Sequence, residues 1–173
     1  MDVFEAIRKR RSVRAYTSEG VSDEDVKSLI EAARWAPSAG NIQPWEFVIV
    51  TNLEIKRKLS DAALHQTFIE KAPVVIVVCA DVARSSWGYG YRGANLYCLQ
   101  DTAAATENIL LAAQALGLAT CWVGAFHEDE VAKAINTPTN VRPVAIVPVG
   151  HPAEKPGAPR KRPMREIVHY ETF

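Results

Sequence analysis

The segment Ala36–Trp45 gathers neutral hydrogen-bonding groups into what its residue types predict to be a stiff turn between a helix and a strand. Pro37 ends the preceding helix, and Gly40 and Asn41 are residue types that tolerate a positive φ. Pro44 then imposes an extended start on the strand that follows. Three side chains offer donors and acceptors without charge: Ser38, Asn41 and Gln43. Such a turn is suited to a polar, uncharged heterocycle, although the same residues also make ordinary connections.

Positive charge gathers near the two ends of the chain, although the 20 basic residues balance 20 acidic ones. The terminal cations are Arg8, Lys9, Arg10, Arg11, Arg14, Lys155, Arg160, Lys161, Arg162 and Arg165. Arg10, Ser12 and Arg14 alternate just beyond a predicted helix, so an extended chain would place their side chains on one side. Guanidinium groups bind phosphate bidentately, and a neutral protein with local basic clusters favours a compact anion over nucleic acid. A solvated run of charge remains the alternative for these residues.

The spacing of cysteine and histidine gives no support to a disulfide framework or a metal site. Cys79, Cys98 and Cys121 are widely separated and lie in apolar surroundings, which is typical of buried thiols. The four histidines show no HExxH or other metal-ligand spacing. No apolar run reaches membrane-spanning length, and no signal-peptide core follows Arg8–Arg11, so we expect a cytoplasmic protein without a membrane partner.

Two familiar motifs occur in the wrong structural context. Gly88–Gly93 satisfies the G-x-G-x-x-G pattern, but it begins eight residues after the predicted strand ends at Ala80, and no acidic residue follows at the required distance. The aromatic loop predicted at 84–93 instead suits either a mobile lid over a planar substrate or a plain surface loop. Ala36–Gly40 resembles the elbow of serine hydrolases, yet a helix precedes Ser38 and a strand follows, which reverses the order of that elbow.

With 173 residues and 48% apolar content, the chain is sized for a single domain, residues 1–173, with one substantial core. Capping residues followed by apolar residues at helical spacing predict helices after Asp2, Ser22 and Asn52. The longest helical stretch, Gly93–Leu116, is so poor in charge that it must be buried almost all round. A shorter helix is expected at 127–135, strands at 45–50, 74–80, 119–123 and 141–149, and an extended tail at 152–163. This order suits an α+β, three-layer arrangement, in which Pro143 and Pro148 would place the last strand at an edge or give it a bulge.

Six segments resemble, in the same order, those of the FMN-dependent nitroreductase family, and together they extend over nearly the whole chain. They are Arg10–Arg14, Ala36–Trp45, Ala72–Pro73 with the apolar strand after it, Gln100–Ala105, Gly117–Phe126 and Arg160–Pro163. The resemblance implies a central mixed, mostly antiparallel sheet flanked by helices. It also implies a homodimer in which a domain-swapped C-terminal arm crosses to the partner.

The resemblance further implies which residues bind the cofactor. The FMN phosphate and the nearby part of the ring would be contacted by Arg10, Arg11, Ser12 and Arg14, with Arg160 and Arg162 completing the phosphate site. The turn that reaches the cofactor of the other subunit would consist of Pro37, Ser38, Ala39, Gly40, Asn41 and Gln43. The backbone of Gly124 and Ala125 would face flavin N5, and Gln66 lies near the position of a flavin-facing amide.

These implied assignments predict an FMN-dependent oxidoreductase that takes electrons from NADH or NADPH and passes them to a second small molecule in a ping-pong reaction. Hydride would enter at flavin N5, and nitroaromatics, quinones or free flavins would act as acceptors. The cofactor would carry the reactivity, so no catalytic acid or base is assigned to the protein. The alternative is a flavin-binding protein that consumes or delivers flavin without general NAD(P)H-driven turnover.

Overall fold

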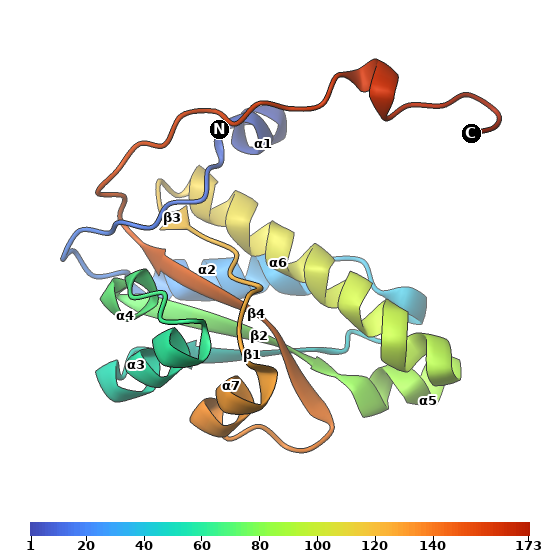
Figure 1. Ribbon diagram of the computed structural model, residues 1–173, viewed down its shortest axis with the longest axis horizontal. Helices are drawn as coiled ribbons and strands as arrows, with labels where there is room; N and C mark the ends of the chain where they lie inside the picture. The colour runs from blue at the N-terminus through green and yellow to red at the C-terminus, as the bar shows by residue number, and fades with distance from the viewer.

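The sheet at the centre of the protein has four antiparallel strands. The computed structural model describes residues 1–173, and its strands are β1 (Trp45–Val50), β2 (Val74–Asp81), β3 (Ala119–Thr120) and β4 (Val141–Gly150). They are arranged in the order β1-β2-β4-β3, so β2 pairs with β1 on one side and with β4 on the other (Figure 1). The β-branched run of β2 is buried on both faces, as the sequence predicts for a strand covered by helices on both sides.

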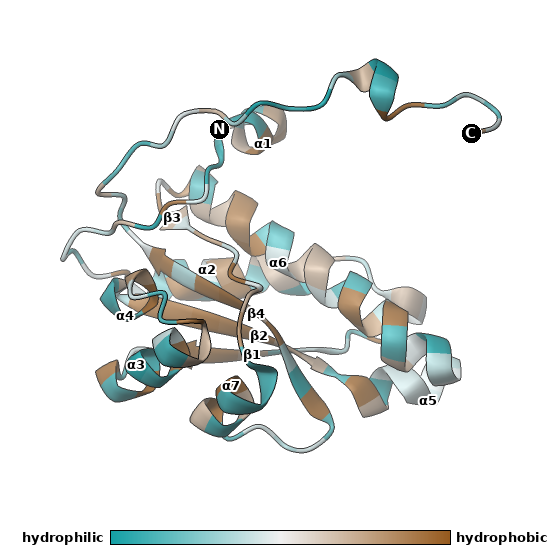
Figure 2. Ribbon diagram, in the orientation of Figure 1, coloured by the Kyte–Doolittle hydropathy of each residue, from teal (hydrophilic) through white to brown (hydrophobic).

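Helices cover both faces of the sheet and form the three layers that the sequence predicts. They are α1 (Val3–Lys9), α2 (Asp23–Arg34), α3 (Leu53–Ala62), α4 (Phe68–Lys71), α5 (Val82–Arg92), α6 (Cys98–Ala115) and α7 (Glu128–Ile135). Helices α2 and α6 share a core with Ile76 and Val78, whereas α3, α4 and α7 pack around Val75 and Val77. Alternate side chains of β2 thus point to opposite layers, and Figure 2 shows apolar strands between the helices. None of the helices has the length and apolar character needed to cross a membrane.

Three helices begin where the sequence signals place them. The side chains of Asp2, Ser22 and Asn52 accept the backbone N–H groups of Glu5, Asp25 and Ile55 at 2.9, 3.0 and 3.1 Å. These caps satisfy donors that have no partner within the first turn of a helix. The predicted starts of α1, α2 and α3 are therefore confirmed.

The prediction of a loop at 84–93 is wrong, because most of this segment lies in helix α5. Asp81 caps the helix by accepting the N–H of Arg84 at 3.0 Å. The helix is interrupted at Gly90, whose φ of 52° and ψ of −137° are accessible to glycine. The chain then continues through a π-helical turn, Gly93–Tyr97, into α6. Glycine lowers the helix propensity of this segment, whereas its cap and its packing against the rest of the protein favour the helix.

The last two strands differ in part from the sequence prediction. β3 has only two residues, and beyond it Val123 makes an isolated bridge to Ile146. The register between β2 and β4 shifts next to Pro143, in agreement with the predicted bulge. β4 nevertheless has a neighbour on each side, because β3 joins it at its C-terminal end. All strands pair in antiparallel fashion, and the parallel contact is confined to a single bridge between Ser12 and Thr120.

The C-terminal arm, residues 151–173, leaves the body of the protein after β4 and passes beside α1 (Figure 1). It then continues through one 3-10 turn, η3 (Met164–Glu166), and reaches outward as the sequence predicts. Apolar side chains remain exposed at Ile167, Tyr170 and Phe173 of the arm and on the predicted apolar face of α1, formed by Val3, Phe4 and Ile7. A group of exposed apolar side chains on one helix face, such as that of α1, is typical of a surface that contacts another molecule.

Candidate functional site

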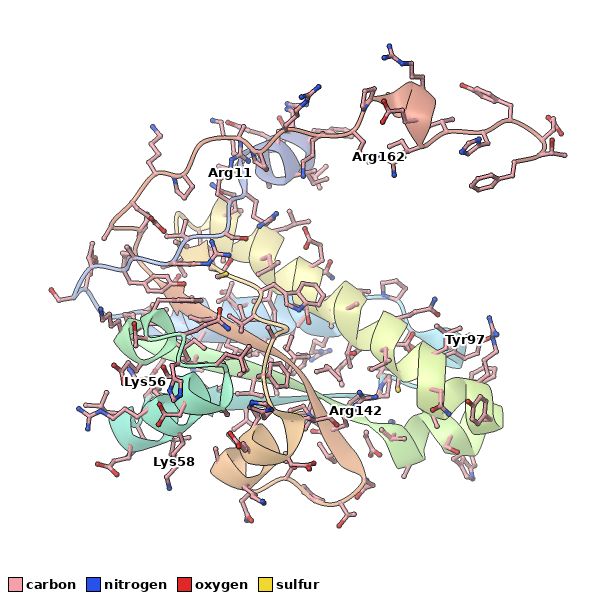
Figure 3. The ribbon with its side chains drawn as sticks, in the orientation of Figure 1. Arg11, Lys56, Lys58, Tyr97, Arg142 and Arg162 are labelled. Carbon is pink, nitrogen blue, oxygen red and sulfur yellow. The ribbon has the colours of Figure 1, made fainter.

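A basic groove lies where the segment after α1 meets the C-terminal arm. Its volume is about 540 Å³, and it is lined by Ile7, Arg8, Arg10, Arg11, Ser12, Pro156–Pro159 and Lys161. No acidic side chain takes part in this lining. In Figure 3, Arg11 lies beside the arm at the point where the arm passes α1. The structure therefore brings the two basic ends of the chain together.

Pairing with β3 fixes the backbone of the basic segment that follows α1. Ser12 forms its bridge with Thr120, and the N–H of Val13 donates to Thr120 O at 3.0 Å. Arg10 Nε lies 3.8 Å from Glu107 Oε1 of α6, and Arg11 Nη1 donates to the backbone carbonyls of Arg8 and Arg10 at 2.7 Å each. Arg10 is thus oriented by a single acid, whereas part of the Arg11 guanidinium is already bonded to the backbone.

The arm supplies Lys161 to the groove, and not the two arginines that the resemblance implies. Arg160 and Arg162 do not line it within one subunit, and Arg162 Nη2 donates to Glu166 O at 2.9 Å. Figure 3 places Arg162 farther along the arm, near η3. Neighbouring side chains of an extended chain point to opposite sides, which separates Lys161 from the residues before and after it. The run of basic residues predicts that this segment of the arm contributes to the groove, but it does not reveal which of the alternating side chains faces the groove.

Three of the predicted cofactor-binding residues lie on segments that contact one another or α4: Gln66, Ala125 and Arg14. Gln66 Nε2 donates to Ala63 O at 2.8 Å and to Ala125 O at 3.2 Å, so its amide joins the loop after α3 to the segment after β3. The Arg14 guanidinium lies over the Phe68 ring, 5.8 Å from its centroid. The structure therefore places two of the predicted ring contacts, Gln66 and Ala125, directly against each other.

The backbone at Gly124 faces open space. A Cβ at this position would meet only Trp122 Nε1, at 3.9 Å, so no neighbour in the chain requires a glycine here. Space beside an uncovered backbone is suited to a ligand that approaches closely. Nearby Cys121 is buried, and burial raises the pKa of its thiol against the opposing effect of Arg14. A neutral, buried thiol is inert, so this segment offers backbone groups and space and no nucleophile.

Gly40 and Asn41 in the Ser38–Gln43 turn have the positive φ that the sequence predicts, and Gln43 has a positive φ that it does not predict. The turn follows α2 and Pro37, and the φ values of Gly40, Asn41 and Gln43 are 55°, 56° and 55°. The Ser38 hydroxyl accepts the N–H of Gln43 at 3.0 Å, and Gln43 Nε2 donates to Asn41 Oδ1 at 3.1 Å. The polar side chains therefore stiffen the turn itself, and Ser38 is not arranged as a nucleophile.

The turn and the basic groove lie at different ends of α6. The turn meets the beginning of this helix, where the N–H of Ala39 donates to Asp101 Oδ1 at 3.1 Å. The basic segment approaches the helix at Glu107 and near its C-terminal end, at Gln114 and Gly117. Helix α6 has 18 residues and is therefore about 27 Å long. One subunit does not bring the two predicted groups of cofactor-binding residues together.

Helix α5 contributes two residues beside the turn, and both come from the 84–93 segment that the sequence predicts to be either a substrate lid or a plain surface loop. Arg84 Nε donates to Ile42 O at 2.6 Å, and Arg84 and Trp87 line a hollow next to Gly40 and Asn41. Trp87 is almost fully exposed in this position. The aromatic composition of the segment does not reveal its contact with the Ser38–Gln43 turn, because that contact arises only from the packing of α5.

Comparison with known proteins identifies the family. The sequence profile of the nitroreductase family matches residues 7–70 and 62–151. A protein of Archaeoglobus fulgidus, provisionally named NADH dehydrogenase/NAD(P)H nitroreductase, is 38% identical over 158 residues, which cover 89% of this chain and 87% of that protein. An FMN reductase (NADPH) of Bacillus subtilis is 29% identical over 99% of this chain and 74% of its own length.

Solved structures show the same relationship. NfrA2 of B. megaterium superimposes with a TM-score of 0.92 at 30% identity, covering 100% of this chain and 76% of that one. The NADPH:FMN oxidoreductase of Vibrio harveyi, in its complex with NAD+, superimposes with a TM-score of 0.91 at 26% identity, covering 99% and 77% of the two chains. The chain belongs to the nitroreductase family of oxidoreductases and is homologous to NAD(P)H nitroreductases and FMN reductases.

Proposed function

We propose that the protein binds FMN and uses it to transfer electrons from NADH or NADPH to nitroaromatics, quinones or free flavins. The observation that supports this best is the basic groove, where cations from both ends of the chain meet without an acidic residue in the lining. Guanidinium, ammonium and hydroxyl groups form a donor set suited to a phosphate monoester. The chain continues from Thr120, which bridges to Ser12, to the open backbone at Gly124 four residues later, so one segment would accompany both the phosphate and the ring.

Different parts of the chain would hold different parts of the cofactor. Arg10, Arg11 and Ser12 would bind the phosphate together with Lys161, while Arg160 and Arg162 would contribute from the arm after it has moved onto a partner. The backbone of Gly124 and Ala125 would face flavin N5. Gln66, held by the carbonyl of Ala125 at 3.2 Å, would lie at the edge of the ring.

The Ser38–Gln43 turn would act in a homodimer, on the cofactor of the partner subunit. Within one subunit α6 separates the turn from the basic groove, whereas a two-fold symmetric dimer can place the turn of each subunit beside the groove of the other. The exposed apolar face of α1 and the apolar side chains of the arm are surfaces that such a dimer would cover. We therefore include the crossing of the C-terminal arm to the partner in this proposal.

When bound, FMN supplies two-electron redox chemistry, taking a hydride equivalent from the nicotinamide and passing electrons to the second substrate. The residues of the chain bind the phosphate, orient the ring and leave space above the backbone at Gly124. No side chain is assigned as a catalytic acid or base.

Initial-rate kinetics test this function. With NADH or NADPH varied at several fixed concentrations of a quinone or a nitroaromatic, we expect parallel double-reciprocal lines, because the nicotinamide leaves before the acceptor binds. Intersecting lines would contradict the ping-pong order. The competing function, a flavin-binding protein that consumes or delivers flavin, predicts that FMN binds but that neither nicotinamide supports turnover with any of these acceptors.

Replacing Arg14 with glutamine is expected to lower the reduction potential of bound FMN. In this proposal Arg14 would lie near flavin N1 and O2, where its charge would favour the anionic reduced form. Loss of one charge-assisted contact of about 1.5 to 3 kcal/mol corresponds to roughly 30 to 65 mV for two electrons. Equilibration with a reference dye measures the potential. Arg142→Gln is the matched control, because Arg142 pairs with Glu128 at 2.8 Å, and equal potentials in the two variants would refute this role of Arg14.

A further inference from the structure

Asp101 is a buried carboxyl group near the start of α6 that lies outside the set of cofactor-binding residues proposed above. It is only 6% exposed. Oδ1 accepts the N–H of Ala39 at 3.1 Å, whereas Oδ2 is buried without a hydrogen-bond partner. Burial raises the pKa of Asp101, and the bond from Ala39 opposes this effect. A buried carboxyl with an unpaired oxygen is unfavourable for stability, so the packing of the fold alone does not explain an acid at this position.

The bond to Ala39 connects Asp101 with the first residues of the Ser38–Gln43 turn. The other side-chain bonds near this point, from Gln43 to Ser38 and Asn41, stay within the turn. They give the turn its shape, but they do not fix its position relative to the helices. Asp101 fixes the position of the start of the turn, because α6, the helix that carries Asp101, is itself anchored in the core.

Helix α5 holds the later part of the turn through close packing. Arg84 Nε donates to Ile42 O at 2.6 Å. A Cβ on Gly88 would lie 2.2 Å from Ile42 Cδ1, and a Cβ on Gly40 would lie 2.5 Å from Tyr89 Oη. A side chain at either position would have to displace the end of the Ile42 or Tyr89 side chain, so glycine leaves room for the close approach of the helix and the turn.

We infer that Asp101 is a positioning residue for the flavin site, fixing the start of the Ser38–Gln43 turn while Arg84 and Tyr89 fix its later part. The inference rests on the proposed function, in which this turn lies against the FMN of the partner subunit. A turn that is already anchored loses little conformational freedom when the cofactor binds, so anchoring raises the affinity. Helices α5 and α6 of one subunit thereby set the affinity of the other subunit's cofactor site.

Substitution of Asp101 by alanine and by asparagine tests this inference, because asparagine keeps an oxygen acceptor for the N–H of Ala39 and alanine does not. We expect Asp101→Ala to weaken FMN binding about tenfold or more, and Asp101→Asn to stay within about threefold of the unmodified protein. Equal affinities of Asp101→Ala and the unmodified protein would overturn the inference. Equal losses in the two Asp101 variants would overturn it as well.

Asn108→Ala is the matched control on the same helix. Asn108 Nδ2 donates to Ala32 O of α2 at 2.9 Å and has no hydrogen bond to the turn. This variant is expected to lower the melting temperature without weakening FMN binding. A loss of FMN affinity in Asn108→Ala as large as that in Asp101→Ala would assign the effect to general destabilisation and overturn the inference.

Arg84→Met tests the same anchoring without a buried substitution, should Asp101→Ala fail to fold. Arg84 is exposed, so its replacement leaves the core intact while removing the donor to Ile42 O. We expect FMN binding to weaken about threefold to tenfold, as for loss of one hydrogen bond. Unchanged affinity in this variant would argue against anchoring of the turn by α5 and overturn that part of the inference.

A mixed dimer separates this inference from the proposed function on which it rests. One subunit carries Asp101→Ala and the other Arg10→Ala, and two affinity tags isolate the mixed species. If the turn of each subunit acts on the FMN of its partner, one of the two FMN sites contains both substitutions and the other contains neither. Half of the sites then bind FMN with the affinity of the unmodified protein. If no site recovers, the turn does not position the partner's cofactor and the inference fails. An unmodified protein that binds no FMN would refute the proposed function itself.

Discussion

Replacing Arg10 with alanine is expected to weaken FMN binding by about tenfold to a hundredfold while leaving riboflavin binding unchanged. Arg10 lines the basic groove, where Glu107 orients its guanidinium. A charge-assisted hydrogen bond to phosphate contributes about 1.5 to 3 kcal/mol, and riboflavin lacks the phosphate. Fluorescence titrations with the two flavins measure the two affinities.

Arg142→Ala is the control for this substitution. Arg142 is likewise an arginine paired with a single acid, Glu128, but it lies on β4 near α7, away from the arm that passes Arg11 (Figure 3). Its replacement should leave both flavin affinities unchanged. An unaltered FMN affinity in Arg10→Ala, or an equal loss for riboflavin, would contradict the assignment of Arg10 to the phosphate.

Replacing Gly93 with alanine is expected to lower the free energy of unfolding by about 1 to 3 kcal/mol. The added Cβ would lie 2.2 Å from Ser85 O and 2.7 Å from Ser85 C. These are backbone atoms of α5, so they can yield only if the helix shifts, which would also strain the bond from Ser85 Oγ to Gly93 O, now 3.0 Å long. Urea unfolding followed by circular dichroism measures the change.

Gly20→Ala is the matched control for Gly93→Ala. A Cβ on Gly20 has no neighbour within 4 Å, and its backbone does not have a positive φ. We expect its free energy of unfolding to remain within about 0.5 kcal/mol of the unmodified protein. If Gly93→Ala were as stable as Gly20→Ala, the close approach of α5 to the start of the π-helical turn would be refuted.

The elements that the sequence predicts correctly are those whose structure is determined by nearby residues. Asp2, Ser22 and Asn52 cap their helices through side chains three residues away from the donors they satisfy. The run at 74–80 is uniformly apolar, so it identifies a strand buried on both faces. Gly40 and Asn41 have the positive φ values that their types suggest, since their conformation depends mainly on their own side chains.

The features that the sequence does not reveal depend on distant contacts. Asp101 looks like an ordinary acid in the first turn of a helix, and its bond to Ala39 exists only once α2 and α6 have packed together. The glycines of α5 lower its helix propensity, and only the folded structure shows that Gly88 accommodates Ile42. The choice of Lys161 for the groove depends on how the extended arm is rotated as it passes α1.

The separation of the turn from the basic groove also depends on contacts between residues that are distant in the sequence. Both groups of residues are visible in the sequence, yet α6 holds them apart within one subunit. Local patterns cannot show how two copies of a chain meet, because this depends on the complementary shape of whole surfaces. The dimer is therefore a proposal, supported by the uncovered apolar residues of α1 and the arm.

Anaerobic addition of NADH or NADPH to the FMN-loaded protein tests the central claim most directly. We expect one of the two nicotinamides to bleach the visible absorption band of the bound flavin in a stoichiometric reaction, and a quinone or a nitroaromatic to restore it. A protein that takes up no FMN, or whose bound FMN is reduced by neither nicotinamide, would contradict the account.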